Sequence, residues 1–320
     1  MNLSVIIPVY NEVESLPRLH RSIHDAMDCL PDLCWEVVYV DDGSSDGSTE
    51  ILEKLAFTNP QHTCVISLRR NFGQTAAIAA GIDHAKGEVI VLLDADLQND
   101  PADIPMMIEK IDQGFDVVSG WRINRQDTFF TRKLPSRLAN RLISMVTGVH
   151  LHDYGCTLKA YRREVLTGFR LYGEMHRFIP AYAHSVGAKM VEVPVHHHPR
   201  RFGKTKYGLT RTLKVILDLF TVKFLISYAH KPIYLFGGAG LFLILTSLIS
   251  FLILIIRKFT VHIDVLPSPL FQMSTMFMIL GFQSILMGLI AELLARTYHE
   301  SQHKTTYTVR KIIRNSLESV

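Results

Sequence analysis

The chain has 320 residues, which is enough for one globular domain and a sizeable appendage. Hydrophobic residues make up 48% of it, and its mean hydropathy of +0.17 is high for a water-soluble protein. The formal net charge of +4 is only a mild basic bias, and we predict no nucleic-acid partner. The four cysteines lack a C-x-x-C spacing, which argues against a cysteine-bound metal and favours reduced thiols in a cytosolic environment.

The first part of the chain alternates between short apolar segments and segments with apolar residues at helical spacing. No cleavable signal peptide precedes the first apolar segment, so we expect this part to stay in the cytoplasm. Helical spacing is clear at Leu16, Leu19, Ile23 and Met27, and Ser48 is placed to cap the next helix. This alternation predicts an α/β fold with a doubly wound, mostly parallel sheet. The apolar segments predict five of its strands, Leu3–Val9, Trp35–Val40, Cys64–Leu68, Val89–Leu93 and Val117–Ser119.

Two aspartates, Asp94 and Asp96, follow the apolar run Val89–Leu93. The run is continuous, as expected for a strand that is buried on both faces. Ligands of open α/β sheets bind at the carboxyl ends of the strands. Two hard oxygen ligands at such an end can hold Mg²⁺ or Mn²⁺, which in turn binds a diphosphate. The alternative is an ordinary strand-to-loop turn with two solvated aspartates.

Polar residues also follow the first two predicted strands, at Tyr10–Glu12 and at Asp41–Gly43. Right-handed crossovers place the carboxyl ends of parallel strands on one edge of the sheet, so these groups and Asp94–Asp96 converge in one cleft. The chain has neither a G-x-G-x-x-G motif nor a Walker A motif to hold phosphates. We therefore predict a nucleotide site in which a divalent cation holds the diphosphate.

A basic stretch covers residues 121–137 and contains a single acidic residue, Asp127. Arginine presents a planar fork to phosphate, so the stretch predicts an anion clamp, with a solvated basic loop as the alternative. Its cations are Arg122, Arg125, Arg132, Lys133 and Arg137.

Two further strands are predicted beyond the basic stretch. Residues 153–159 form a loop entering a strand that precedes a short helix, Arg163–Gly168, and Lys189–Val195 forms another strand. Three consecutive histidines, His196–His198, follow. Because neighbouring residues of a strand point to opposite faces, these histidines make a poor ligand set, and we predict no metal there.

The last third of the chain is far more apolar than the rest. Ile233–Ile256 contains no charged residue and at 1.5 Å per residue reaches roughly 36 Å, enough for a hydrocarbon core of about 30 Å. A second uncharged run, 265–291, predicts another helix over about 272–295. The preceding residues 200–231 carry eight basic residues and one acidic residue. They are typical of an amphipathic helix on an anionic membrane surface, with a helix packed on the domain as the alternative.

Basic residues flank the two predicted spans on their outer sides, whereas the connecting loop has only Arg257 and Lys258. By the positive-inside rule, we predict an integral inner-membrane protein with its N-terminal domain and both termini in the cytoplasm. Gly237, Gly238 and Gly240 would allow close helix packing and leave a homo-oligomer open. The predicted parts are a domain over 1–199, a juxtamembrane segment over 200–231, a transmembrane hairpin over 232–296 and a basic tail over 297–320.

Three motifs in this order resemble those of family 2 glycosyltransferases with the GT-A fold, namely Val5–Glu12, Val40–Ser44 and Leu93–Gln98. The resemblance covers about residues 1–230. Later stretches are similar to the polyprenyl-phosphate branch, which includes bactoprenol glucosyltransferases and dolichol-phosphate mannose synthase; these are Gly120–Arg122, Asp153–Arg162 and Arg201–Lys206. The Q-x-x-R-W motif of processive polysaccharide synthases is missing, since the only tryptophans are Trp35 and Trp121. A long polysaccharide product is therefore not expected.

The resemblance implies roles for particular residues. Asp94, Asp96 and Gln98 would hold Mg²⁺ or Mn²⁺, with Asp96 as the principal ligand, and Asp153 is a candidate base whose alternative role is to orient Lys159 or an arginine. The nucleotide sugar would meet Pro8, Tyr10, Asn11, Glu12, Asp41, Asp42, Gly43, Asp94 and Ala95. The acceptor phosphate would meet Arg122, Arg132, Lys133, Ser136, Arg137, Arg201 and Lys206.

The reaction implied is transfer of a hexose from a nucleotide sugar to polyprenyl phosphate at the surface of the lipid bilayer. Glucose from UDP-glucose and undecaprenyl phosphate are the expected pair, with mannose or an aminoarabinose-type sugar as alternatives. A phosphate oxygen would attack the donor carbon C1 in line and invert its configuration. Two other classes remain alternatives: a non-catalytic nucleotide-sugar-binding scaffold, and a translocator of lipid-linked sugar, which two nearly charge-free spans disfavour.

Overall fold

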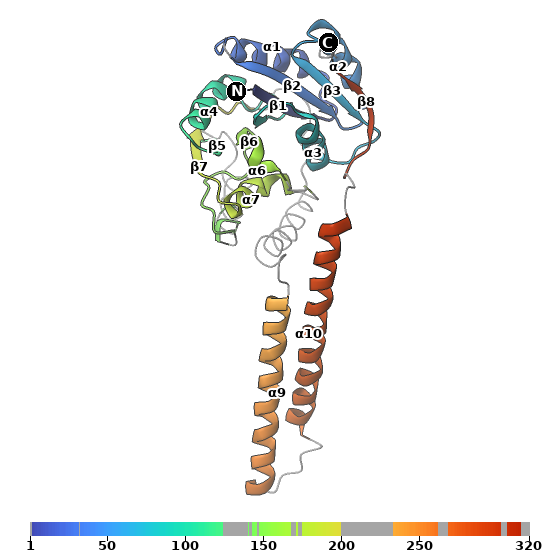
Figure 1. Ribbon diagram of the computed structural model, residues 1–320, viewed down its shortest axis with the longest axis vertical. Coiled ribbons are helices and arrows are strands. Elements are labelled where there is room, and N and C mark those ends of the chain that lie inside the picture. The colour runs from blue at the N-terminus through green and yellow to red at the C-terminus, as the bar shows by residue number, and fades with distance from the viewer. Residues whose placement is uncertain are drawn as a thin grey trace. The chain divides into compact units, whose positions relative to one another are not determined.

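The computed structural model describes residues 2–31, 33–123, 140, 143–145, 147–167, 171, 175–199, 233–261, 268–301 and 306–314. The chain divides into two compact units, residues 1–222 with 305–320, and residues 223–304 (Figure 1). The first unit is an α/β domain and the second is a pair of long helices. The predicted juxtamembrane helix over 200–231 lies outside the described residues.

The α/β domain is built on a sheet in which the described residues form eight strands, in the order β7-β5-β6-β4-β1-β2-β3-β8. Four neighbouring strands, β3-β2-β1-β4, run parallel and form its centre. The five strands expected from the first part of the sequence are all present, with ends that shift by one or two residues. The strands are β1 Asn2–Val9, β2 Cys34–Asp41, β3 Thr63–Leu68, β4 Val89–Leu92, β5 Val117–Trp121, β6 Lys159–Arg162, β7 Met190–Pro194 and β8 Val309–Ile313.

The sheet is mostly parallel, as expected, but it is mixed because two of its described strands are reversed. Strand β6 runs antiparallel between β4 and β5, and β8 runs antiparallel to β3. Because β5 is antiparallel to β6, it points the same way as β4, and β7 is parallel to β5. The carboxyl ends of β1 to β5 and of β7 therefore share one edge of the sheet, called here the carboxyl edge. The amino end of β6 lies at the same edge, so Lys159 pairs with Leu92.

Helices cover both faces of the central strands (Figure 1). The predicted helical residues Leu16, Leu19, Ile23 and Met27 are all buried and share one core with α2, α4 and the strands. On the other face α3 lies so close that a Cβ on Gly81 would come within 2.3 Å of Ile6 Cγ2. The described helices of the domain are α1 Leu16–Met27, α2 Ser48–Thr58, α3 Gln74–His84, η1 Pro101–Asp103, α4 Ile104–Asp112, α6 Arg163–Leu166, η3 Met175–Phe178 and α7 Ile179–Ser185.

Ser48 does not cap α2, contrary to the expectation from sequence. Gly47 occupies the N-cap position with a φ of 95°, and Ser48 is the first helical residue. The Ser48 hydroxyl accepts a hydrogen bond from the Glu12 amide at 3.0 Å and donates one to Asp46 at 2.6 Å. Ser48 thus joins the turn after β1 to the turn after β2.

Strand β8 was not predicted, because residues 297–320 read as a basic tail. It pairs with β3, and its Lys311 forms an ion pair with Glu53 at 2.7 Å. Arg314, directly after the strand, forms one with Glu36 at 2.9 Å. Just before it, the Tyr307 hydroxyl donates to Asp83 at 2.8 Å. The segments before α9 and after α10 therefore contribute to one folded unit.

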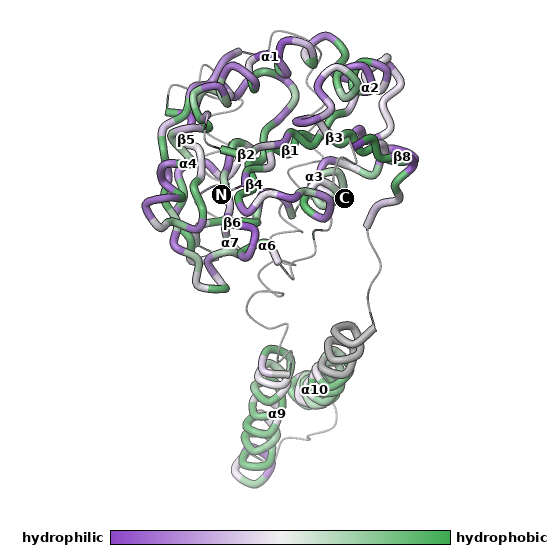
Figure 2. Tube along the Cα trace, turned by 45° about the horizontal axis from the view of Figure 1, so that its top comes forward, coloured by the Kyte–Doolittle hydropathy of each residue, from purple (hydrophilic) through white to green (hydrophobic). Residues whose placement is uncertain are grey.

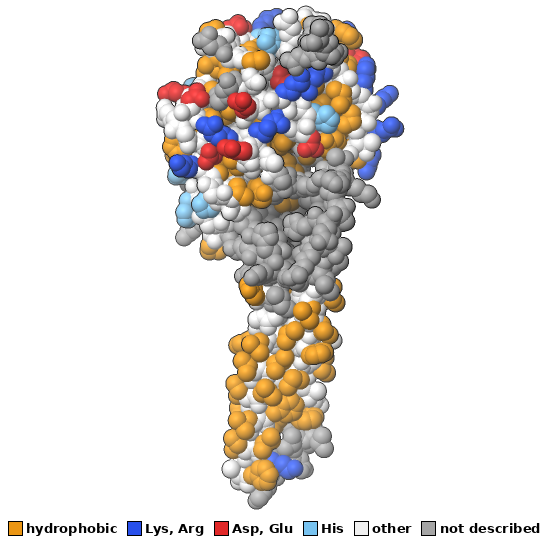
Figure 3. Space-filling model, in the orientation of Figure 1, with side chains coloured by type: hydrophobic (Ala, Val, Ile, Leu, Met, Phe, Trp, Pro, Cys, Tyr) orange, Lys and Arg blue, Asp and Glu red, His pale blue; other side chains and the backbone are white. Residues whose placement is uncertain are grey.

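The second unit consists of α9, Ile233–Val261, and α10, Pro269–Ser301. Within them Tyr234–Thr260 and Pro269–Ala291 are long and apolar enough to cross a membrane. Hydrophobic residues predominate along both helices (Figure 2). Their side chains cover the face of the helix pair that Figure 3 shows. Exposed apolar surface of this extent is rare on a water-soluble protein. The two helices are therefore candidate membrane spans, as expected, although α10 begins three residues before the predicted start.

Small residues line the contact between α9 and α10. A Cβ on Gly240 would lie 2.6 Å from the Gly281 carbonyl oxygen, and one on Gly281 would lie 2.7 Å from that of Gly240. The buried Ser247 hydroxyl donates to the Ser274 carbonyl at 2.6 Å. Backbones that approach this closely tolerate no side chain, so the glycines set the distance between the helices.

Candidate active site

Asp94 follows β4 at the carboxyl edge and is held by two side chains from distant parts of the chain. Gln74, the first residue of α3, donates to Asp94 Oδ1 at 2.8 Å, and Thr157 donates to Oδ2 at 2.6 Å. Burial and the neighbouring charge of Asp96 raise the pKa of Asp94 to about 6. Two carboxylates that repel one another in this way make a site where a cation would be stabilised.

Asp96 is partly exposed and is bonded to its own loop. The backbone amide of Gln98 donates to Asp96 Oδ1 at 3.1 Å, and the side-chain amide of Gln98 donates to Oδ2 at 2.9 Å. Leu97 between them has a φ of 59°, a left-handed conformation that is uncommon for a residue with a side chain. The three predicted metal ligands Asp94, Asp96 and Gln98 thus lie on one short loop.

Asp41 and Asp42, at the end of β2, are almost fully buried, with 2% and 3% of their surface exposed. Asp41 accepts hydrogen bonds from the Ser44 amide at 3.0 Å and from Thr49 Oγ1 at 2.6 Å. Asp42 accepts bonds from the backbone amides of Phe72 and Gly73 at 2.7 and 2.8 Å. Burial raises the pKa of Asp42, although these two amide bonds oppose the shift. Each oxygen of this buried pair therefore accepts one hydrogen bond from the protein itself.

Gly43 allows the turn after β2 to approach the segment after β3. Its φ is 72°, and a Cβ there would lie 2.7 Å from the Arg70 carbonyl carbon. A side chain at this position would push the two segments apart. Gly43 thus serves the close approach that lets Asp42 reach the Phe72 and Gly73 amides.

The turn after β1 also reaches the carboxyl edge. Asn11 has a φ of 53°, and its amide donates to Ser44 Oγ at 3.0 Å while its side chain accepts from the Ser45 amide at 2.9 Å. Tyr10 is 37% exposed. Pro8 lies beside Val40 in the sheet, and the Glu12 amide donates to Ser48. Because β4, β1 and β2 are adjacent, the predicted convergence of these polar strand ends is confirmed.

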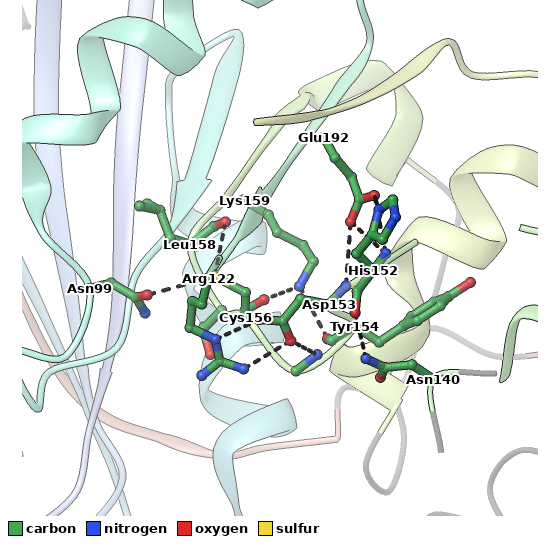
Figure 4. A network of polar contacts seen from close by, with 12 residues as sticks. Asn99, Arg122, Asn140, His152, Asp153, Tyr154, Cys156, Leu158, Lys159 and Glu192 are labelled. Atoms are coloured by element: carbon green, nitrogen blue, oxygen red, sulfur yellow. Dashed lines mark hydrogen bonds and ion pairs between the residues drawn. The ribbon is translucent and has the colours of Figure 1, made fainter. Parts of the chain in front are cut away.

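A buried ion pair lies beside Asp94, at the end of β5. Arg122 Nε donates to Asp153 Oδ2 at 2.6 Å and its terminal nitrogen donates to Oδ1 at 2.9 Å. The side chains are 11% and 7% exposed, and they point at one another (Figure 4). Burial disfavours the charge on Arg122, but the bonds to Asp153 outweigh it and raise the pKa of Arg122 above its usual value. In this geometry Asp153 orients an arginine, the alternative role expected from the sequence.

Lys159 is a second buried cation near the ion pair and is 3% exposed. Its Nζ donates to the backbone carbonyls of Tyr154 and Cys156 (Figure 4). Burial lowers the pKa of Lys159. The Cys156 thiol donates to Asn99 at 3.6 Å. Lys159 therefore braces the 153–157 loop that carries Asp153 and Thr157.

Sequence reasoning missed Gln74 and Thr157 as partners of Asp94. Gln74 begins a helix and Thr157 lies in a loop, and neither position carries a local motif. Only the tertiary fold brings them to the end of β4.

The remaining predicted acceptor residues lie outside the part of the chain that the structure describes; they are Arg132, Lys133, Ser136, Arg137, Arg201 and Lys206. Ala95 is buried between the two aspartates. Among the described residues no group of three or more His, Cys, Asp and Glu side chains could hold a metal. A cation at Asp94 and Asp96 would therefore take its other ligands from the Gln98 amide, from solvent and, once the donor is bound, from the substrate.

A cavity of about 270 Å³ lies at the opposite edge of the sheet, where the parallel strands begin. Its walls include Trp35, Glu36, His62 and Arg314. Asp94 and Asp96 are at the other edge, so this cavity is separate from the candidate site.

The family model described as "Glycosyl transferase family 2" matches residues 4–169, which is more than half of the chain. The chain belongs to glycosyl transferase family 2. It is thus a glycosyltransferase, as the motifs at the carboxyl edge predicted. The matched region includes β1 to β6 and contains Asp94, Asp96, Arg122 and Asp153.

Two relatives match almost the entire chain. The dodecaprenyl-phosphate galacturonate synthase of Rhizobium johnstonii is 41% identical over 315 residues, or 98% of this chain and 93% of that protein. An undecaprenyl-phosphate 4-deoxy-4-formamido-L-arabinose transferase of Enterobacter sp. is 39% identical over 311 residues, covering 97% and 93%. The similarity extends through α9 and α10, so both relatives align with the helix pair as well as the domain.

Two solved structures share the fold at low identity. The S. aureus TarS 1-349 structure with UDP-GlcNAc has a TM-score of 0.52 and 20% identity, and the match covers 70% of this chain and 67% of that one. The Mycobacterium tuberculosis glucosyl-3-phosphoglycerate synthase with Mn²⁺ and UDP-glucose has a TM-score of 0.51 and 18% identity, with coverage of 69% and 78%. These likenesses confirm the expected GT-A fold.

Proposed function

We propose that the protein transfers a sugar from a nucleotide sugar to a polyprenyl phosphate. The observation that carries the proposal is the pair Asp94 and Asp96 at the carboxyl edge, set beside the buried Arg122–Asp153 pair. Two relatives that match 97% and 98% of the chain carry dodecaprenyl phosphate or undecaprenyl phosphate and a sugar in their names, which supports this acceptor class.

The nucleotide of the donor binds between the turns that follow β1 and β2. Pro8, Tyr10 and Glu12 border the base and ribose, and Tyr10 is exposed enough to contact a ligand. Asn11, Asp41 and Gly43 fix the shape of the two turns through the bonds described above. Asp42 fixes the segment at Phe72 and Gly73 beside these turns.

The donor set at the end of β4 fits a hard divalent cation such as Mg²⁺ or Mn²⁺. Asp96 and Asp94 offer carboxylate oxygens, and Gln98 offers an amide oxygen. Burial, together with the charge of Asp96, raises the pKa of Asp94 to about 6. When bound, the cation neutralises charge on the diphosphate leaving group. Gln74 and Thr157 hold Asp94 in place for that ligand role.

The acceptor phosphate supplies the nucleophile. A phosphate monoester has a second pKa of about 6, so at neutral pH it attacks without a strong general base. One of its oxygens forms a bond to the sugar carbon C1 while the bond from C1 to the diphosphate breaks, with inversion. Arg122, oriented by Asp153, offsets the repulsion between acceptor and donor phosphates. Arg132, Lys133, Ser136, Arg137, Arg201 and Lys206 complete the acceptor site in this proposal.

The sugar expected from the sequence differs from the sugars in the names of the two relatives. Glucose from UDP-glucose was expected from the sequence, whereas the two relatives are named for galacturonate and a formamido-arabinose. We therefore consider glucose, galacturonate and aminoarabinose-type sugars as candidates for the transferred sugar. The polyprenyl phosphate is common to all three.

The helix pair anchors the protein in the inner membrane, beside its lipid acceptor. Strand β8 pairs with β3, so the chain leaves the α/β domain before α9 and rejoins the domain after α10. Two spans then return the chain to the side from which it started. The basic residues on the outer flanks of the spans support a cytoplasmic location for that side and for both termini.

An assay with radiolabelled donors tests the proposal. The purified full-length protein is incubated with Mn²⁺, undecaprenyl phosphate and each of a panel of labelled UDP- and GDP-sugars. Label that enters the organic phase with one donor, and not with the Asp96→Ala variant, supports the proposal. Donor binding without transfer of any sugar would favour a non-catalytic nucleotide-sugar-binding protein.

A further inference from the structure

The segment that follows β7 crosses directly over the loop that carries Asp96 and Gln98. This segment, residues 195–198, is called here the histidine strap. The amide of Val195 donates to the Trp121 carbonyl at 3.0 Å, and His197 forms an antiparallel bridge with Asn99. The amide of His198 donates to the Gln98 carbonyl at 2.8 Å. The strap is therefore joined to both the end of β5 and the Asp96 loop.

Two histidine side chains fasten the strap to the turn that follows Gln98. Both carboxylate oxygens of Asp103 accept bonds from His196, Oδ2 from its backbone amide at 2.6 Å and Oδ1 from Nδ1 at 2.7 Å. His198 Nε2 lies 3.0 Å from Asp100 Oδ2. Asp100 Oδ1 accepts from the Ala102 amide at 3.0 Å and so caps η1. Each histidine thus pairs with one of the two aspartates that bracket η1.

The contacts continue from the strap to the carboxylate of Asp96. The backbone amide of His198 donates to the carbonyl of Gln98. Gln98 in turn donates to Asp96 with both its backbone and side-chain amides. Leu97, between the two, is in the left-handed region with a φ of 59°. A backbone in that region costs of order 1–3 kcal/mol and persists only where its surroundings enforce it. The strap supplies contacts that enforce it.

The two imidazoles are too exposed to act mainly by packing in the hydrophobic core. The side chain of His196 is 77% exposed and that of His198 is 43% exposed, whereas Asp103 is only 7% exposed. Exposed side chains bury little apolar area, so their loss changes the stability of the whole domain only slightly. Their effect is concentrated on Asp100 and Asp103, which they contact directly after the Asp96 loop.

We propose that His196 and His198 are positioning residues that hold Gln98 and Asp96 in the conformation that receives the divalent cation. The inference rests on the proposed function, because that function supplies the cation. It assigns the histidines no direct bond to the metal. It also gives a use to a run of histidines that had no role in the sequence interpretation.

The test is Mn²⁺ binding to the full-length protein in detergent, followed through the electron paramagnetic resonance of free Mn²⁺ without any substrate. His198→Gln and His198→Asn are both polar and differ by one methylene. The longer amide reaches Asp100 as Nε2 of histidine does, and the shorter one does not. We expect His198→Gln to bind Mn²⁺ within about twofold of the wild type, and His198→Asn to bind roughly fivefold to tenfold more weakly, the value of one lost hydrogen bond.

The same reasoning applies to His196, but here asparagine is the variant that keeps the hydrogen bond. The amide nitrogen of His196→Asn takes the place of Nδ1 and is expected to preserve Mn²⁺ binding, whereas His196→Ala weakens it by roughly fivefold. His184→Asn, an exposed histidine at the end of α7, is the matched control and leaves binding unchanged. Equal Mn²⁺ affinity for His198→Gln and His198→Asn would overturn the inference.

Asp96→Ala distinguishes failure of the inference from failure of the proposed function. If Asp96→Ala abolishes Mn²⁺ binding and both His198 variants bind like the wild type, the metal site stands and the strap has no positioning role. If the wild type itself shows no Mn²⁺ binding that depends on Asp96, the metal site and the inference both fall.

Discussion

Two pairs of acidic residues lie at the carboxyl edge of the sheet, one at the end of β2 and one after β4. The two pairs differ in burial and in their hydrogen-bond donors. Asp41 and Asp42 at the end of β2 are buried, and three of their four hydrogen-bond partners are backbone amides. Asp94 and Asp96 after β4 are partly exposed and are bonded mainly by side chains. Each of the four carboxylates accepts two hydrogen bonds, so the pairs differ in burial and in the kind of donor. The buried pair shapes a turn, whereas the partly exposed pair has lone pairs that a cation can reach. The sequence pattern of the two pairs does not reveal this difference.

The largest effect is expected from Asp96→Ala. Loss of the principal metal ligand removes the charge that stabilises the leaving diphosphate, so transfer should fall by roughly 100-fold to 1000-fold. The melting temperature should stay within about 2 °C of the wild type, because Asp96 is partly exposed. The rate is measured with labelled donor and undecaprenyl phosphate. Asp25→Asn, at an exposed position of α1, is the control. A variant that retained most of its activity would remove Asp96 from the site.

Asp42→Ala is expected to show the opposite signature, a loss of stability. The buried amides of Phe72 and Gly73 would lose their acceptor, which costs about 2 to 3 kcal/mol in the free energy of unfolding. Denaturant unfolding followed by tryptophan fluorescence measures this cost. Asp42→Asn keeps one acceptor oxygen and should lose about half as much. Unchanged stability in Asp42→Ala would show that the two acidic pairs are more alike than the bonds indicate.

Mn²⁺ affinity is expected to depend on pH through Asp94. Its pKa is raised to about 6 in the metal-free protein, so the carboxylate is ionised above that pH and protonated below it. Protons then compete with the cation, and the apparent affinity should fall by up to about tenfold for each pH unit below 6. Titrations at pH 7.5, 6 and 5 measure this. A constant affinity over that range would mean that Asp94 does not contribute to the metal site.

The smallest effects come from a matched pair of threonines. Thr157 donates to Asp94 and Thr49 donates to Asp41, each at 2.6 Å. Thr157→Val should slow transfer by about tenfold and change stability little, because one fastening of Asp94 is lost. Thr49→Val should lower the free energy of unfolding by about 1 kcal/mol and change the rate less than about twofold. Similar effects of both variants on the rate would erase the distinction between the two acidic pairs.

Local patterns predicted the central part of the fold correctly. Continuous apolar runs located β1 to β5, and the spacing of Leu16, Leu19, Ile23 and Met27 located α1 and its buried face. These elements depend mainly on their own residues. The same is true of the two long apolar helices, whose composition alone sets them apart.

Long-range pairings were beyond such patterns. Strand β8 has five residues, of which Arg310, Lys311 and Ile312 are exposed, and it becomes a strand only because β3 offers an unpaired edge. The reversal of β6 likewise depends on where β4 and β5 lie. Gln74, Thr157 and the Arg122–Asp153 pair join residues 20 to 63 positions apart, so no window of sequence shows them.

The position of a bound Mn²⁺ ion tests the central claim most directly. A structure of the full-length protein with Mn²⁺ and a nucleotide sugar, with the ion located by its anomalous scattering, would place it. The account predicts a single strong peak within bonding distance of an Asp96 carboxylate oxygen and of the donor diphosphate. A peak at Asp41 and Asp42, or a diphosphate bound away from the end of β4, would contradict it.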